Sequence, residues 1–202
     1  MSLEQSSLPQ PAKEYYNKGL FAFEKKNYDY AIELFAQALT LKKDFADARH
    51  YLRLSEQKKF QENPPPTVLV LLNKIKNLPS LLKALICDIK NKPDCAIDEY
   101  EKILKAEPNN TYILTRLAQD LLKERDANSA LRTFEEIKLI DPRNIVALKN
   151  LGQLYSQMDN YALARQCYES ILKVLPHDPE AEKGIKNLDA LGAIKESFGQ
   201  SE

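Results

Sequence analysis

The sequence predicts an all-α fold, an α-α superhelix (solenoid) of stacked helix-turn-helix units. Three landmarks recur along the chain at one constant interval, the thirty-four positions that separate Ala84 from Ala118. They are a small residue at Ala84, Ala118 and Gly152, an alanine at Ala96, Ala130 and Ala164, and a proline at Pro108, Pro142 and Pro176. A helix pair of this length cannot bury its apolar face alone, so successive copies stack and share one core. With only 5 glycines and no tryptophan, the composition argues against a β-rich or loop-rich architecture.

The first unit is expected over residues 12–45, after a flexible N-terminus over residues 1–11. Apolar residues follow helical spacing on both sides of Asn27, which ends the first helix of the pair. Gly19 and Ala31 place a small residue on each of the two helices, so that the two backbones can approach closely. An aromatic residue four positions after the alanine fills the adjacent space.

Residues 46–76 break the repeat register and are expected to form a degenerate repeat or a helical spacer. A charged helix comes first, and Pro64–Pro66 end it, because proline lacks an amide donor and restricts the residue before it. A short apolar helix over residues 67–76 is expected next, before Pro79. The run Val68–Leu72 is apolar on all sides and must be buried by something. Docking onto the array is one way to bury it, and a homodimer contact or insertion into a partner's groove is the alternative.

Three regular tandem units are expected over residues 77–178. A final helix over residues 179–197 is expected to cap the array, because terminal repeats need a polar outer face and this segment is rich in Lys and Glu. Residues 198–202 are expected to form a flexible tail.

The chain carries 29 basic and 29 acidic residues, and its formal net charge is zero. A nucleic-acid binder would need a basic footprint, so no nucleic acid is expected as a partner. Between Lys42 and Lys92, however, eleven basic residues stand against five acidic ones. This excess is typical of a solvated helix face, and the alternative is a local patch that steers an acidic partner.

The sequence predicts a cytoplasmic protein without membrane insertion. The N-terminus lacks the basic-then-apolar pattern of a signal peptide, and the longest apolar run, Val68–Leu72, is too short to cross a bilayer. The three cysteines, Cys87, Cys95 and Cys167, show no paired spacing. An odd count without an export signal is typical of reduced thiols in a cytoplasm.

No arrangement of residues typical of an active site occurs in the sequence. The two histidines, His50 and His177, have no recognisable catalytic partner, and there is no glycine-rich phosphate loop or metal-spaced His/Cys cluster. The chain is therefore expected to be no enzyme and to bind no cofactor and no metal.

The repeated residues resemble the tetratricopeptide repeat. An alanine followed four positions later by an aromatic residue occurs at Ala31 and Phe35, Ala96 and Tyr100, Ala130 and Phe134, and Ala164 and Tyr168. Leu117-Ala118 and Leu151-Gly152 match the middle of the family's first helix, and the recurring prolines match its closing position. The resemblance covers roughly two thirds of the chain. Residues 46–76 lie outside it, and Lys43 stands where the first unit would have its closing proline.

This resemblance implies a right-handed superhelix whose concave surface, lined by the first helix of each unit, holds a segment of a partner protein. The candidate groove residues are Tyr16, Leu20, Phe23, Leu81, Leu85, Ile89, Tyr112, Thr115, Gln119, Lys123, Lys149, Asn150 and Gln153. The groove is expected to be apolar toward its N-terminal end and polar toward its C-terminal end. Thr115 with Lys149, and Gln119 with Gln153, are each separated by one repeat interval and are expected to be neighbours across stacked units.

The sequence therefore indicates a non-enzymatic protein-protein interaction module, an adaptor or scaffold, whose partner is another protein or a peptide segment. The alternative is a cytoplasmic client-binding chaperone resembling the type III secretion translocator chaperones, and a regulatory subunit that docks on an enzyme is a third possibility. A homodimer is also possible. One subclass of the family grips the carboxylate end of heat-shock chaperone tails with paired Lys and Asn residues. Tyr16 and Leu20 stand at those places, so that mode of binding is not expected.

Overall fold

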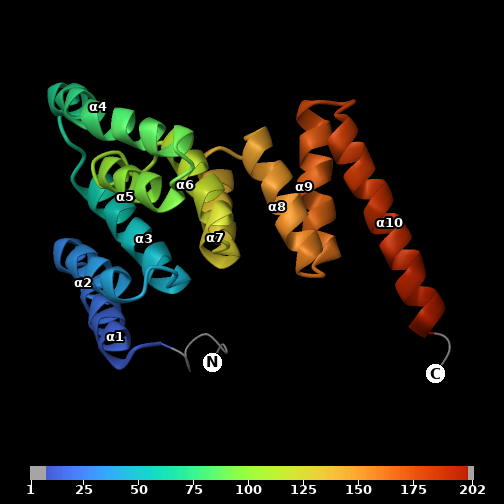
Figure 1. Ribbon diagram of the computed structural model, residues 1–202, viewed down its shortest axis with the longest axis horizontal. Coiled ribbons are helices and arrows are strands. Elements are labelled where there is room, and N and C mark those ends of the chain that lie inside the picture. Colours follow the sequence, from blue (N-terminus) through green and yellow to red (C-terminus); the bar gives the residue numbers. More distant parts are fainter. Residues whose placement is uncertain (1–7, 200–202) are drawn as a thin grey trace. The chain divides into compact units, whose positions relative to one another are not determined.

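The computed structural model describes residues 8–199, with side chains described through residue 191. All regular secondary structure in this range is helical. Within that range ten helices follow one another, joined by short loops (Figure 1). They are α1 (Gln10–Glu24), α2 (Tyr28–Leu41), α3 (Ala46–Glu62), α4 (Thr67–Ile89), α5 (Pro93–Leu104), α6 (Thr111–Lys123), α7 (Ala127–Ile140), α8 (Ile145–Gln157), α9 (Tyr161–Val174) and α10 (Pro179–Gly199). The all-α prediction is confirmed.

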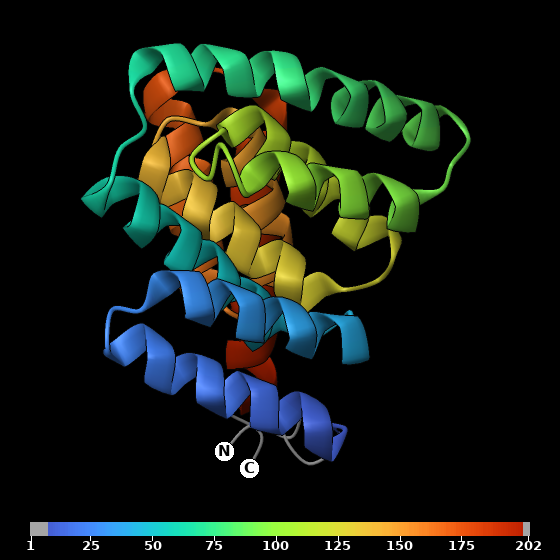
Figure 2. The ribbon, with the colours of Figure 1, turned by 90° about the vertical axis from the view of Figure 1, so that its left-hand side faces the viewer.

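These helices divide into two compact units, residues 1–133 and residues 134–202, and the division falls inside α7. The three tandem units expected over residues 77–178 are therefore shared between the two. Figure 2 faces the first unit, with α1 at one edge and α4 at the opposite edge.

The first pair of helices, α1 and α2, crosses at a glycine. A Cβ atom added to Gly19 would lie only 2.6 Å from Cε1 of Phe35, so no larger residue fits without displacing this ring. Ala31 and Phe35 are fully buried, as their spacing predicted. α2 also packs against α3, and Tyr51 of α3 stacks on the same Phe35 ring at a centroid distance of 5.7 Å.

The next pair repeats this crossing. Ala84 of α4 and both Ala96 and Tyr100 of α5 are fully buried. Because α5 packs against both α4 and α6, one second helix joins the first helices of two successive pairs. This arrangement is the stacking that the repeat interval predicted.

Cys87 and Cys95 form a disulfide bond between the end of α4 and the first turn of α5. The prediction of reduced thiols is wrong for these two residues, whereas Cys167 is free and buried. The chain reverses at Asn91, whose φ is 51°, and the two cysteines lie four residues before and four residues after it. The helical hairpin thus brings their Cα atoms to 5.8 Å. Symmetry about the turn is the signal that would have revealed the pair, and the cytoplasmic location stays a prediction.

α4 is a single helix of 23 residues, and this corrects two expectations. The boundary expected after residue 76 falls inside α4, and the short helix expected over residues 67–76 does not end before Pro79. A proline within a helix leaves the carbonyl four residues earlier, here that of Ile75, without its helical partner. Both residues lie on the exposed side of α4, where water can solvate that carbonyl, and the helix continues.

The expectation that the array buries the run Val68–Leu72 is also wrong. Four of its residues, Val68, Leu69, Leu71 and Leu72, are 40–70% exposed. The physical reason is that α4 runs straight on and does not fold back over the preceding helices.

In the second unit, Tyr168 of α9 lies between two glycines. A Cβ atom on Gly152 of α8 would lie 2.7 Å from the ring, and one on Gly184 of α10 would lie 2.6 Å from it. α10 packs against both α8 and α9 and buries Ala181 and Leu188. The role of this helix as a cap stays a prediction.

Both ends of the chain depart from their expected limits. α1 begins at Gln10 and Ala12 is fully buried, so the helix starts within the segment 1–11 that was expected to be flexible. At the other end, α10 continues to Gly199, two residues beyond its expected end. Residues 1–7 and 200–202 of the two expected flexible segments lie outside the described range.

Replacing Gly184 with alanine is expected to destabilise the second unit by about 1–3 kcal/mol, because the new methyl group meets a ring that Gly152 already confines from the other side. At an open helical position the same change would be stabilising, since alanine is the better helix former. Urea unfolding followed by circular dichroism measures the difference. When Tyr168→Leu is combined with Gly184→Ala, the loss of stability should be smaller than the sum of the two single losses. A loss in the double variant that equals this sum would contradict this packing.

Unreduced, denatured protein is expected to show one titratable thiol per chain, that of Cys167, and three after reduction. The variant Cys87→Ser should show two before reduction, because Cys95 then lacks its partner. Ellman's reagent counts the thiols directly. Three thiols before reduction would contradict the disulfide.

Candidate protein-binding surface

Candidate groove residues of α4 and α6 reach the surface of the first unit. We call the α4–α6 surface the set Leu81, Leu85, Ile89, Tyr112, Thr115, Gln119 and Lys123. Ile89 is 85% exposed and Tyr112 is 58% exposed, and Lys123 is exposed as well. The other four are half-buried. The side chains from α4 are apolar and those from α6 are mostly polar, and these two helices are the first helices of two successive pairs.

Asp88 fixes α4 to α6 behind this surface. Its carboxylate accepts a hydrogen bond from the Tyr100 hydroxyl of α5 at 2.8 Å and forms an ion pair with Arg116 of α6. The ammonium group of Lys123 lies 3.8 Å from Oδ1 of Asp88 and 2.5 Å from Oδ1 of Asp120. Three helices thus share one charged network, which holds the two first helices in register.

The pKa values of the two carboxyl groups of this network are shifted in opposite directions. Burial alone would raise the pKa of Asp88, but hydrogen bonds from Tyr100 and Arg116 outweigh it and hold the pKa below its ordinary value. Burial raises the pKa of Asp120, which is only 1% exposed, and the nearby Asp88 carboxylate adds to the effect. Because Arg116 and Lys123 are already engaged, the surface offers a ligand mainly apolar groups and uncharged hydrogen-bonding groups.

The three candidates on α1 do not join this surface. Tyr16 is 8% exposed, and its ring centroid lies 4.8 Å from that of Phe45. Burial accordingly raises the pKa of Tyr16 to about 12. Leu20 and Phe23 pack against the same core. All three stabilise the first unit, and we leave them out of the proposed binding surface.

The three candidates on α8 lie in the second unit. Lys149 forms ion pairs with Asp178 at 2.9 Å and Glu180 at 2.6 Å. The side-chain amide of Asn150 donates to a backbone carbonyl of its own helix, and Gln153 is exposed. The expected pairing of α6 residues with these α8 residues joins the two units and stays a prediction.

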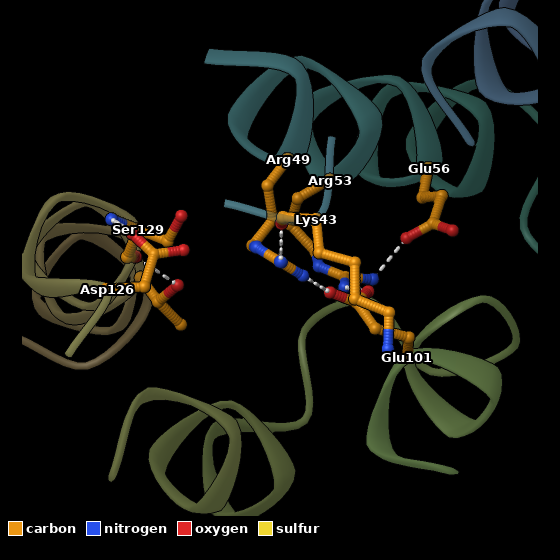
Figure 3. Close-up of polar contacts among 8 residues, drawn as sticks. Lys43, Arg49, Arg53, Glu56, Glu101, Asp126 and Ser129 are labelled. Carbon is orange, nitrogen blue, oxygen red and sulfur yellow. Dashed lines mark hydrogen bonds and ion pairs between the residues drawn. The ribbon is translucent and has the colours of Figure 1, made fainter. Parts of the chain in front are cut away.

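A largely buried ion-pair cluster, which the sequence did not reveal, joins α3 to α5 in the first unit (Figure 3). Arg49 donates to Glu101 and to the backbone carbonyl of Lys43, each at 2.6 Å. Arg53 is ion-paired with both Glu101 and Glu56. The two positive and two negative groups balance one another, as buried charges must. Such long-range pairs leave no periodic signal in a sequence.

Protonation within this cluster is uneven. Burial raises the pKa of Glu56 to about 7, although Arg53 lies beside it. Burial would also raise the pKa of Glu101, but the two arginines outweigh it and lower the pKa. Arg53 is thus shared by two carboxylates, and Glu56 is the first of them to take up a proton.

Among the residues with described side chains, no group of three or more His, Cys, Asp or Glu residues is placed to hold a metal ion. In the same part of the chain, no helix combines the length and apolar character that crossing a membrane requires.

Sequence comparisons find relatives along most of the chain. Models of the tetratricopeptide repeat family match residues 12–45 and 121–188, which together make up half of the chain. Protein O-mannosyl-transferase Tmtc3 of Drosophila melanogaster is 27% identical over 195 residues, which cover 88% of this chain and 21% of that protein. A putative cytochrome c-type biogenesis protein CcmH of Haemophilus influenzae is 31% identical over 52% of this chain and 25% of that protein. The chain thus spans about a fifth to a quarter of these curated relatives.

Solved structures show the same fold at low sequence identity. The Arabidopsis OM64 TPR domain is 19% identical with a TM-score of 0.53, over 58% of this chain and 98% of that one. The first TPR domain of Spaghetti (RPAP3), bound to the HSP90 peptide SRMEEVD, is 22% identical with a TM-score of 0.53, over 58% of this chain and 94% of that one. A tetratricopeptide repeat protein from Parabacteroides merdae is 19% identical with a TM-score of 0.50, over 93% of this chain and 62% of that one.

The native chain is expected to lose stability as the pH rises, and the variant Glu56→Gln is expected not to show this loss. The folded state binds the Glu56 proton more tightly than the unfolded state does, because burial raises the pKa from 4.5 to about 7. This stabilising contribution is fully present below pH 4.5 and is lost as the pH rises through about 7, by on the order of 3 kcal/mol.

Urea unfolding of both proteins at pH 5 and pH 8 measures this contribution. The exposed change Glu124→Gln is the matched control and should leave the pH profile of the native chain unaltered. Parallel profiles for the native chain and Glu56→Gln would contradict the raised pKa.

Proposed function

We propose, because this chain belongs to the tetratricopeptide repeat family, that its α4–α6 surface binds a segment of another protein. The observation that carries the proposal is that Ile89 of α4 and Tyr112 of α6 are exposed and that Gln119 of α6 is half-buried. These side chains lie on the first helices of two successive pairs, the helices that line binding surfaces in repeat arrays of this kind. The family itself is one of protein-protein interaction modules.

The chemistry of this surface favours a segment with one apolar anchor and an adjacent stretch of hydrogen-bonding groups. Leu85, Ile89 and Tyr112 provide the apolar contacts, and the Gln119 amide can both donate to and accept from a peptide backbone. Lys123 is already paired with Asp120, so binding does not depend on a ligand carboxylate.

The solved domain bound to the HSP90 peptide supports peptide binding as a use of this fold. For this chain we propose a different class of segment. Tyr16 and Leu20, which stand where a carboxylate clamp would need Lys and Asn, are buried and half-buried against the core of the first unit.

We further propose that the chain acts as a non-enzymatic adaptor and not as a client-binding chaperone. An unfolded client would need a long apolar groove. Tyr16, Leu20 and Phe23, the residues that would extend the apolar end, pack into the core and leave a short binding surface.

The combined variant Ile89→Ser, Tyr112→Ala and Gln119→Ala is expected to lose its partner with the fold intact, since two of these side chains are exposed and the third is half-buried. Affinity purification from the native host, with quantitative mass spectrometry, measures which proteins are lost. An adaptor should lose stable, stoichiometric partners, whereas a chaperone should lose one aggregation-prone client.

The matched control is Leu139→Gln, because Leu139 is an exposed helical residue of the second unit, at 84% exposure. It should retain every partner. The proposal would be overturned if the triple variant bound the same partners as well as the native chain does.

A further inference from the structure

One side of α4 carries an apolar stripe that no described residue covers. We define the α4 stripe as Val68, Leu71, Ile75, Leu78, Leu82 and Ile86, which follow one another in steps of three or four residues. Each of these side chains is 50–70% exposed. The stripe extends over about 27 Å of helix, at 1.5 Å per residue. In the views of Figures 1 and 2, α4 forms an edge of the first unit.

The corresponding side of α6 is covered by a helix, and the comparison shows what α4 lacks. Arg116, one repeat interval after Leu82, donates to the Tyr100 hydroxyl of α5 at 3.3 Å. Asp120, one repeat interval after Ile86, is 1% exposed, whereas Ile86 is 50% exposed. α5 is the second helix of the pair before α6. The side of α6 that matches the stripe is therefore the side that meets the preceding pair of helices, α5 through Tyr100 and α4 through Asp88.

α4 has no preceding second helix because its own N-terminal half takes the place of one in the sequence. α3 is followed directly by α4, and residues 67–76 run straight on in place of turning back. The uncovered region consequently has the size and apolar spacing of a missing helix. Steps of three and four residues are also the spacing by which one helix packs along another.

Basic side chains border the stripe. The exposed charged residues of α4 are Lys74, Lys76 and Lys83, and its one acidic residue, Asp88, is engaged by Arg116 behind the helix. Lys83 is paired with Glu99 at 2.6 Å. No ion pair to Lys74 or Lys76 occurs among the described residues. A ligand helix would thus meet an apolar centre with positive edges.

Charge complementarity selects among the possible occupants. A second copy would place lysines against lysines whether its α4 ran parallel or antiparallel, and such like-charge contacts are unfavourable. A lipid surface would also attract lysines, but the stripe is aliphatic and has none of the aromatic side chains that anchor helices at a membrane interface. An amphipathic helix with acidic residues beside its apolar face satisfies both the centre and the edges.

We propose that the α4 stripe binds an amphipathic helix of a partner protein whose apolar face is flanked by Asp or Glu. This helix would take the place of the second helix that the repeat array lacks before α4. The inference goes beyond the proposed function, because the stripe and the α4–α6 surface share no residue.

The test uses two synthetic helical peptides, each long enough to span the whole stripe and each with leucine and isoleucine at heptad spacing. One peptide has glutamate and the other has lysine at the flanking positions. Fluorescence anisotropy with the full chain measures both affinities. We expect the glutamate peptide to bind at least about tenfold more tightly than the lysine peptide, with a preference that weakens as salt is added.

Three variants separate the contributions. Ile75→Gln with Leu82→Gln should weaken the glutamate peptide about tenfold or more without affecting the fold, since both side chains are exposed. Lys74→Gln with Lys76→Gln should reduce the discrimination between the peptides. Leu139→Gln is the control and should bind as the native chain does, and circular dichroism confirms that each variant is folded.

Other occupants predict different results. No binding of the glutamate peptide, or equal binding of both peptides, would overturn the proposal. A dimer in sedimentation that Leu82→Gln dissociates would assign the stripe to a second copy. Flotation with phosphatidylserine vesicles that depends on the stripe would assign it to a membrane surface.

Discussion

The shared carboxylate of Glu101 is the interaction on which the first unit depends. Two arginines of α3 converge on it, and through it the helices before α4 are joined to the helices after it. Removing one member of such a cluster leaves a buried charge without compensation, which is more costly than never having formed the pair. The unit thus relies on a specific polar contact at the point where the repeat pattern fails, and on apolar packing elsewhere.

The helix crossings are the part of the fold that sequence could predict. Small residues such as Gly19 and Ala96 recur at fixed distances from an aromatic residue, and close packing at the crossing requires that pattern. The position of α3 could not be predicted, because the ion pairs of Arg49 and Arg53 join residues about 50 positions apart and have no period. The continuation of α4 through Pro79 depends on solvent exposure, which the sequence alone does not specify.

The candidate site was predictable to a similar extent. Ile89 and Tyr112, which repeat register assigned to the groove, are exposed on α4 and α6, and their part in binding stays a prediction. Repeat register failed on α1, where Tyr16 meets α3 and the aromatic cluster that α3 completes. A prediction of exposure that is carried from one unit to the next by repeat register holds only where the neighbouring unit is regular.

The Cys87–Cys95 bond encloses the connection between α4 and α5, including the exposed turn. A protease that cut between the two cysteines would break the backbone without producing two fragments, because the sulfur atoms would still hold the pieces together. Lys90, which is followed by Asn91, makes this turn a substrate for trypsin-like enzymes, whereas the bond after Lys92 is protected by Pro93. A nicked chain would therefore migrate as one species until it is reduced, and both helices would remain available for binding after cleavage.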